Sequence, residues 1–284
     1  MVATMDGMKF GLYGLHRGSS IEPETLVRRA RLAEAAGFES LWVGDHIALP
    51  PGTGDEMHRL EAVVAVSYLA AVTTRVRLGF GVLVLPQRQP VLLAKQLASI
   101  DVLCGGRLLV GIGVGYVEPE LRALGVALSE RAARTDEYLA VIRSLWTERA
   151  SSYEGQFVSF TDVAQRPRPH QQPHPPIVVG AHSRPGYRRT VQVANGWYGP
   201  YLDLEQTAQA LAELREVATR HERPAALGEL EITITPPPGP IDLDTARRYA
   251  DLGVHRLAIQ PHDDEGTVIE ELVESVGSTL VGQV

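Results

Sequence analysis

The sequence is poor in cysteine and in long apolar segments, and each shortage excludes a class of protein. Cys104 is the only cysteine in 284 residues, so neither an internal disulfide nor a thiolate-rich metal site is possible. The longest apolar stretch, around residues 62–72, is shorter than the roughly 20 residues of a membrane span. The first residues lack the charged and apolar pattern of a secretory signal. We therefore expect a cytoplasmic protein with no membrane partner.

Lysine is also scarce, and the balance of charge is acidic. Only Lys9 and Lys95 are lysines, and the formal net charge is -7. A domain that coats nucleic-acid backbones is usually strongly basic, so we expect no nucleic-acid partner. Hydrophobic residues make up 44% and charged residues 21% of the chain, which is typical of a globular protein and not of a disordered or fibrous one.

Short apolar runs alternate with segments of helical period along the whole chain. The predicted strands are 9–13, 40–43, 76–85, 107–113, 177–179, 196–199, 230–234 and 255–260. The predicted helices are 23–36, 59–73, 90–103, 131–146, 187–194, 203–220, 244–251 and 267–276. About eight strand–helix units in some 250 residues predict an α/β fold of the (β/α)₈ (TIM) barrel type. A doubly wound sheet, the competing fold, normally has fewer units.

No break in composition divides the chain, so we expect one domain over residues 8–284 and a short N-terminal extension over residues 1–7. We expect loop insertions at the C-terminal face of the barrel. Residues 153–160 alternate as a short surface hairpin does. The proline- and histidine-rich tract 166–176 cannot be helical, and we predict that it is a loop crossing the barrel mouth.

Histidines follow four of the predicted strands, and in this fold active sites lie at the carboxyl ends of the strands. They are His16, His46, His182 and His262. Such a group predicts either a metal site or a pocket for a polar, anionic ligand. No His-x-His pair ends the first strand and no carboxylate follows the fourth. A metal-dependent barrel hydrolase is therefore a weaker alternative, and we expect no metal.

Glycines gather at the ends of the third and fourth predicted strands. Gly111, Gly113 and Gly115 alternate and so share one face, and Gly79 and Gly81 lie on the neighbouring strand. Two adjacent strands without side chains predict a flat shelf for a planar ring system, because glycine lets a ligand approach the backbone closely. Tight packing where the barrel narrows is the alternative.

The fifth predicted strand ends in a segment suited to an anion. Gly180, Ala181, His182 and Ser183 precede Arg184, Arg188 and Arg189 at the start of a predicted helix. Backbone amides at a helix start, a hydroxyl and arginines together predict a phosphate cradle. A basic turn exposed to solvent is the alternative.

Six segments, taken in order, resemble the bacterial luciferase-like superfamily and most nearly its coenzyme F420-dependent (deazaflavin) oxidoreductases. The segments are 34–46, 77–86, 90–98, 105–116, 130–137 and 176–180. The likeness is strong through Trp146, moderate to about Trp197 and faint in the last third. It implies a flavin-type cofactor at the barrel mouth, F420 (8-hydroxy-5-deazaflavin) or alternatively FMN. It also implies a small-molecule substrate and a homodimer.

The resemblance also implies roles for individual residues. A bulge with a non-prolyl cis peptide, which supports the back of the ring in relatives, maps onto Gly81-Val82. His46 is the expected acid–base group, with Tyr116 as a second catalytic residue. His16 and His262 are expected to contact substrate. The residues expected to bind the cofactor are Asp45, His46, Gly81, Val82, Val84, Gly113, Gly115, Tyr116, Gly180, Ala181, His182 and Ser183.

One departure from the family pattern bears on the substrate. Some deazaflavin dehydrogenases carry a glutamate at the position of Tyr116, and a phenol with an ordinary pKa near 10 is a weaker acid. This weakens the case for a sugar-phosphate dehydrogenase. The leading hypothesis is hydride transfer between F420 and a small organic substrate. An FMN-dependent luciferase-like monooxygenase is the alternative, followed by a non-catalytic barrel.

Overall fold

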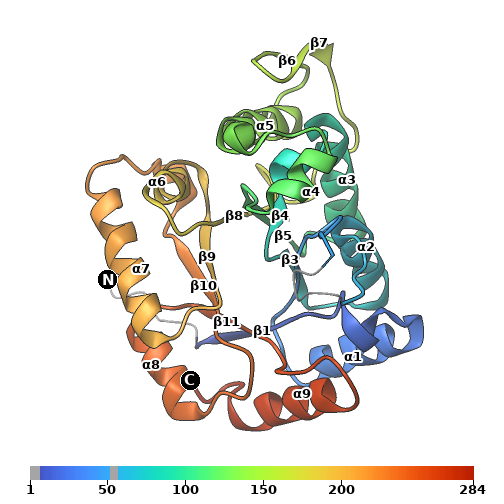
Figure 1. The fold of residues 1–284 in the computed structure, drawn as a ribbon, viewed down its shortest axis with the longest axis vertical. Helices are drawn as coiled ribbons and strands as arrows, with labels where there is room; N and C mark the ends of the chain where they lie inside the picture. The colour runs from blue at the N-terminus through green and yellow to red at the C-terminus, as the bar shows by residue number, and fades with distance from the viewer. Residues whose placement is uncertain (1–6, 52–56) are drawn as a thin grey trace.

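The computed structural model describes residues 7–51 and 57–284. In this part of the chain, eight parallel strands form a closed barrel inside a ring of helices (Figure 1). In order around the barrel, they are β1 (Lys9–Tyr13), β2 (Ser40–Val43), β3 (Arg77–Phe80), β5 (Leu108–Gly113), β8 (Ile177–Gly180), β9 (Gly196–Pro200), β10 (Glu231–Thr235) and β11 (Arg256–Ile259). The predicted (β/α)₈ barrel is confirmed.

Each strand is followed by a helix whose start and end have local causes. The helices are α1 (Pro23–Ala35), α2 (Ala62–Val72), α3 (Pro90–Leu103), α4 (Glu118–Ala123), α5 (Arg131–Thr147), α6 (Arg184–Val193), α7 (Leu204–Ala218), α8 (Leu243–Asp251) and α9 (Val268–Thr279). Proline is the first residue of α1 and α3, where its missing N–H costs nothing. Asp203 and Gln206 form a capping box at the start of α7. Among the described helices, none is both long and apolar enough to span a bilayer.

The third predicted strand differs from the structure in detail. The predicted strand 76–85 is interrupted, because β3 ends at Phe80 and the chain bulges at Gly81 and Val82 before the short β4 (Leu83–Val84). The peptide bond between Gly81 and Val82 is cis, as the resemblance implied. The expected N-terminal extension lies, except for Gly7, outside the described residues.

The segment between α5 and β8 packs against the outer sides of α5 and α3 and ends away from the mouth. It begins with the expected hairpin, β6 (Ser151–Glu154) and β7 (Ser159–Val163), which projects beyond α5 in Figure 1. Within the proline-rich tract, the Gln171 side chain donates to the carbonyl of Leu108, at the start of β5. Pro176 accepts from the Val110 amide as the chain enters β8. The prediction that this tract crosses the mouth is therefore wrong, since the tract leads into the N-terminal end of its strand.

The middle of the barrel interior is filled by two large aromatic side chains. The rings of Trp42 and Tyr198 stack with their centroids 5.5 Å apart, and the Trp42 indole donates to Ser40 Oγ. A methyl group added at Gly11 or Gly79 would come within 2.8 or 2.5 Å of the Trp42 side chain. These two glycines therefore make room for Trp42. Gly79 is not part of a ligand shelf, which corrects that prediction.

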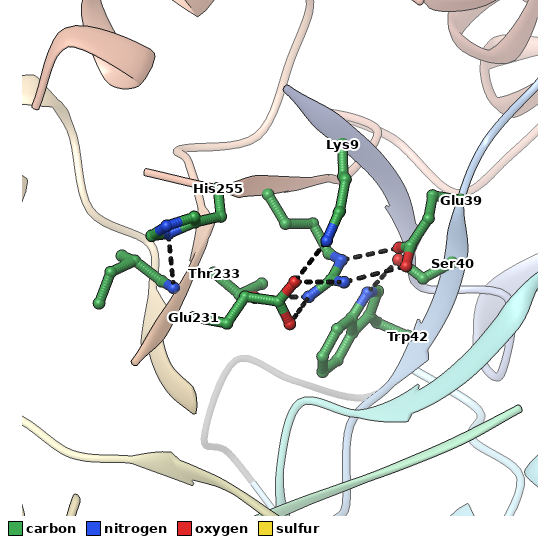
Figure 2. Close-up of polar contacts among 9 residues, drawn as sticks. Lys9, Glu39, Ser40, Trp42, Glu231, Thr233 and His255 are labelled. Carbon is green, nitrogen blue, oxygen red and sulfur yellow. Dashed lines mark hydrogen bonds and ion pairs between the residues drawn. The ribbon is translucent and has the colours of Figure 1, made fainter. Parts of the chain in front are cut away.

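The N-terminal end of the barrel is closed by an ion cluster around Arg256. Its guanidinium group, which is fully buried, binds Glu39 at 2.8 and 3.0 Å and Glu231 at 3.0 Å, and donates to Thr233 Oγ1. Lys9 adds a second cation 2.8 Å from Glu231. Figure 2 shows the two carboxylates, Lys9 and Thr233 converging here. Four of these side chains stand at or before the first residue of their strands, so this end offers little room for a ligand.

Candidate active site

A cavity of about 440 Å³ opens at the carboxyl ends of the strands, within the size range of small-ligand sites. Every residue that the sequence predicted to bind the cofactor lines it. The wall is completed by residues that the sequence analysis did not single out for a site, chiefly Tyr13, Arg131, Tyr198 and Tyr201. The barrel topology therefore brings the predicted segments together at one place.

The glycines at the mouth leave space for the side chain of Val82. A methyl group added at Gly113 or Gly180 would lie 2.6 or 2.9 Å from a methyl carbon of Val82. At Gly111 it would overlap the carbonyl of Phe80, which approaches because the chain bulges there. The predicted bare shelf is thus corrected. The glycines let the bulge fold inward, and Val82 with the backbone of Gly81 presents the surface that faces the cavity.

Asp45 fixes this bulge to the end of β2. Its Oδ2 atom accepts from the Val84 amide at 2.9 Å, and its Oδ1 lies 2.6 Å from Arg88 Nη2. Arg88 in turn pairs with Glu61, the residue that caps α2. Burial raises the pKa of Asp45, although Arg88 opposes the shift. Both carboxylate oxygens already have partners, so Asp45 holds the cavity wall in shape.

His46 is held by a carboxylate that the sequence analysis missed. Its Nδ1 atom lies 3.1 Å from Oε2 of Glu120, whose other oxygen accepts from the amides of Ile47 and Ala48. Burial alone would raise the pKa of Glu120, but the hydrogen bonds from His46 and the two amides outweigh it and lower that pKa. An ionised Glu120 accepts a hydrogen bond from the Nδ1–H group of His46, and so leaves Nε2 available to the cavity. Tyr116 stands edge-on to this imidazole, with ring centroids 6.1 Å apart.

Two of the histidines do not reach the cavity, which corrects their predicted contact with substrate. His16 is buried, and its Nε2 accepts from the Gly44 amide at 3.1 Å. Burial, together with Arg17 and Arg59, lowers the pKa of His16 to about 3, so the ring is neutral and supports the chain after β2. His262 is exposed and lies outside the cavity wall.

The predicted anion-binding segment lines the cavity at the helix start, but not all three of its arginines do. Ser183 caps α6 and accepts from Gly186, and both residues line the cavity. Arg184 instead pairs with Glu216 at 2.9 Å, and Arg188 is exposed outside the cavity wall. Arg189 lines the cavity while bound to Asp136 at 2.6 Å.

Arg131, the first residue of α5, adds a cation that the sequence analysis missed. It lines the same cavity as the α6 start, and its buried Nε atom has no hydrogen-bond partner within the described ranges, 7–51 and 57–284. A buried donor without a partner is costly, and an anion beside it would remove that cost. The helix start, Arg131 and Arg189 therefore fit the phosphate of a flavin-type cofactor.

The geometry of the cavity supports a metal centre less well than it supports a flavin-type cofactor. No group of three His, Cys, Asp or Glu side chains is placed to hold a metal ion within residues 7–51 and 57–284. His16 is bonded to backbone and His46 to Glu120, while His262 lies outside the cavity. The four histidines after the strands therefore do not converge on one point.

A family model described as luciferase-like monooxygenase matches residues 8–251. This chain belongs to that family. The resemblance carried by the six sequence segments is thereby confirmed. Members of the luciferase-like family are oxidoreductases, and they act on small substrates.

Relatives in the family use two different cofactors. The chain is 35% identical over 203 residues to an FMNH(2)-dependent dimethylsulfone monooxygenase of Pseudomonas putida, covering 70% of this chain and 54% of that protein. It is 33% identical over 222 residues to an F420-dependent glucose-6-phosphate dehydrogenase of Kineococcus radiotolerans, covering 75% and 63%. The fold matches that of an F420-dependent secondary alcohol dehydrogenase with a TM-score of 0.81 at 14% identity, covering 98% and 99%.

Proposed function

We propose that this protein is an oxidoreductase that transfers a hydride between coenzyme F420 and a small organic substrate. The observation that carries the proposal is the imidazole of His46 at the cavity wall, fixed through Nδ1 by the buried carboxylate of Glu120. The resemblance of Asp45-His46 to the pair beside the reactive ring of deazaflavin enzymes supports it. So does the likeness to an F420-dependent dehydrogenase.

The cofactor, when bound, supplies the two-electron hydride chemistry, and the chain supplies position and charge. Val82 and the backbone from Gly113 to Gly115 would hold the ring. The start of α6, with Arg131 and Arg189, would hold the anionic part. His46 holds or moves a proton at Nε2, since its other ring nitrogen is engaged by Glu120. Asp45 keeps the bulge in place through Val84 and Arg88.

The test begins with binding. Purified protein is titrated with F420 and separately with FMN, and the fluorescence of each cofactor is followed. Reduced F420 is then mixed, without oxygen, with a panel of aldehydes and ketones, and its oxidation is recorded. We expect F420 to bind, and we expect reduced F420 to be oxidised by at least one of the carbonyl compounds. Binding of neither cofactor would contradict the proposal and favour the hypothesis of a non-catalytic barrel.

A His46→Ala variant separates the chemistry from binding. F420 affinity should change little, because the ring and the anionic part are held by other residues. Hydride transfer to any carbonyl compound that the wild type reduces should fall by about 10²- to 10⁴-fold, the usual contribution of a positioned acid–base group. Unchanged turnover in this variant would remove His46 from the proposed chemistry.

An FMN-dependent monooxygenase is the second candidate, and the likeness to the dimethylsulfone monooxygenase favours it. Oxygen consumption distinguishes the two, because reduced FMN reacts with oxygen and the reduced deazaflavin does not do so readily. Substrate-dependent oxygen uptake with reduced FMN would support this candidate over the F420 enzyme.

We also propose a homodimer, as the family resemblance implies. The helix α2 carries two apolar side chains on its outer surface, Val64 and Tyr68, which are 61% and 41% exposed. Burial of such groups against a second copy would be favourable. Sedimentation of the purified protein at micromolar concentration tests this, with a monomeric mass as the contrary result.

A further inference from the structure

Three phenol side chains line the part of the cavity formed by β1 and β9. Tyr13 is the last residue of β1, Tyr198 lies within β9, and Tyr201 directly follows that strand. Burial raises the pKa of Tyr13 well above its ordinary value, and the nearby Tyr201 and Tyr198 add to the shift. All three phenols therefore line one cavity, and Tyr13 keeps its proton at neutral pH.

The Tyr13 hydroxyl differs from that of Tyr198, which has a hydrogen-bond partner in the described part of the chain. Tyr198 shares a 2.5 Å hydrogen bond with Thr235 Oγ1. The Tyr13 ring meets the edge of His16 and lies under the Arg17 guanidinium group, 5.4 Å from its centre. Its hydroxyl has no hydrogen-bond partner among the described residues, although the side chain is only 8% exposed.

Gly44 provides the space for this hydroxyl, two residues before His46. A methyl group added at Gly44 would overlap the Tyr13 oxygen, so any other residue there would displace it. Buried polar groups nearly always have a partner, and a phenol at a cavity wall can find one in a ligand oxygen. The position therefore sets a hydrogen-bond donor close to the proposed acid–base group.

The cations near this part of the cavity are already paired. Arg17 binds Asp264 at 3.1 Å, and Arg88 binds both Asp45 and Glu61. Arg131 and Arg189 are the arginines among the described lining residues, and the proposed function assigns both to the cofactor. Residues 52–56, outside the described part, contain no lysine or arginine. A substrate carboxylate or phosphate would lose its hydration here without gaining an unpaired arginine or a lysine as counter-ion.

We propose that the β1 and β9 part of the cavity binds an uncharged substrate through one carbonyl or hydroxyl oxygen, to which the Tyr13 hydroxyl donates a hydrogen bond. This inference rests on the proposed hydride transfer. In the reducing direction, the reduced deazaflavin, when bound, would supply a hydride to the carbonyl carbon and would itself be oxidised by two electrons. The π electrons of the C=O bond move to the oxygen, which takes a proton from protonated His46. The product is the neutral alcohol, and His46 regains its proton from water.

The test compares ketones that differ in charge and not in the reacting group. Acetophenone and cyclohexanone are the neutral probes, and para-acetylbenzoate is the anionic partner of acetophenone. Binding to the full-length protein, saturated with F420 where F420 binds, is measured by calorimetry at neutral pH. We expect both neutral ketones to bind, and para-acetylbenzoate to bind at least tenfold more weakly. Equal or tighter binding of para-acetylbenzoate, or no binding of either neutral ketone, would overturn the inference.

The variant Tyr13→Phe removes the hydroxyl and keeps the ring. Affinity for acetophenone should fall about fivefold, the share of one neutral hydrogen bond. The matched control is Tyr153→Phe on the β6–β7 hairpin, outside the cavity wall, which should bind acetophenone as the wild type does. Equal affinity in Tyr13→Phe and wild type would contradict the assigned donor, provided that circular dichroism shows both to be folded.

Cofactor titration of the same samples keeps the two proposals apart. If F420 binds and no neutral ketone does, the inference fails and the proposed function stands. If the neutral ketones bind in a Tyr13-dependent way but neither F420 nor FMN does, the hydride-transfer function fails. The binding site for an uncharged oxygen compound would then remain.

Discussion

The two ends of the barrel use polar side chains in opposite ways. At the N-terminal end, Arg256 has a partner for every nitrogen, in Glu39, Glu231 and Thr233. At the C-terminal mouth, counting only residues 7–51 and 57–284, Arg131 Nε is buried without a hydrogen-bond partner. Within the same residues the Tyr13 hydroxyl makes no hydrogen bond, and His46 is engaged at one ring nitrogen only. Saturated groups stabilise the closed end, while unsatisfied groups at the mouth are what a ligand would satisfy. The difference separates stability from function along one set of strands.

The largest expected effect is on the closed end. Arg256→Met would leave the carboxylates of Glu39 and Glu231 beside each other without their shared cation. We expect the free energy of unfolding to fall by about 3–5 kcal/mol, the cost of breaking a buried ion pair. Urea unfolding measures it.

Arg248→Met, an exposed arginine on α8, is the control for Arg256→Met and should change stability by less than about 0.5 kcal/mol. If Arg256→Met were as stable as this control, the closed end would not be the stabilising end. The proposed division between a stabilising end and a functional end would then be wrong.

Acid should weaken the same cluster in a defined range. Burial opposes ionisation of Glu231, but Arg256 and Lys9 outweigh it and lower its pKa from about 4.5 to about 2. A lowered folded-state pKa gives stability that is present above about pH 4.5 and lost as the pH falls toward 2. We therefore expect Glu231→Gln to cost about 2–3 kcal/mol at pH 7 and clearly less at about pH 3.5. The same cost at both pH values would show that the charge of Glu231 does not matter.

At the mouth, packing beneath Val82 gives the next largest effect. Gly113→Ala would place a methyl group 2.6 Å from Val82 and should destabilise the protein by about 1–3 kcal/mol. Adding Val82→Ala should recover much of this loss, because the clash is removed. Thermal unfolding of the two single variants and the double variant measures the coupling. If the losses of stability in the two single variants simply added in the double variant, Gly113 would not be needed to make space for Val82.

The smallest expected effect concerns binding and leaves the fold unchanged. Arg131→Met should weaken F420 or FMN binding by about tenfold, or roughly 1.4 kcal/mol, without lowering stability. Arg188→Met is the matched control, because Arg188 is exposed on α6 and does not line the cavity. Equal affinity in the two variants, measured by fluorescence titration, would remove Arg131 from the anion site.

The barrel could be predicted from the sequence because each strand and helix is indicated by residues within its own segment. Apolar runs, helix-starting prolines and terminal glycines report only on their own segment, and the order of segments then determines the topology. The same rule located most of the cavity wall, since parallel strands end at one face. It could not say which way a side chain turns. His16 follows a strand as His46 does, yet its ring accepts a hydrogen bond from the Gly44 amide and does not line the cavity.

What the sequence could not predict depends on contacts between distant segments. Glu120 reaches His46 across 74 positions, from a short helix with no clear periodic pattern. From the sequence, Gly113 could equally provide a flat surface for a ligand ring or leave space for a neighbouring side chain. Only the bulge, which brings Val82 against Gly113, shows that the second interpretation is right. The tract 166–176 was placed at the wrong end because composition marks a loop without saying which end of the barrel it joins.

A crystal structure of the protein with F420 tests the central claim most directly. We predict the deazaflavin ring against Val82 and the backbone from Gly113 to Gly115, with the phosphate at the start of α6 beside Arg131. The substrate face of the ring should then be open to His46. A ring bound elsewhere, or a phosphate remote from Arg131 and Ser183, would contradict the assignment of the open end to cofactor binding.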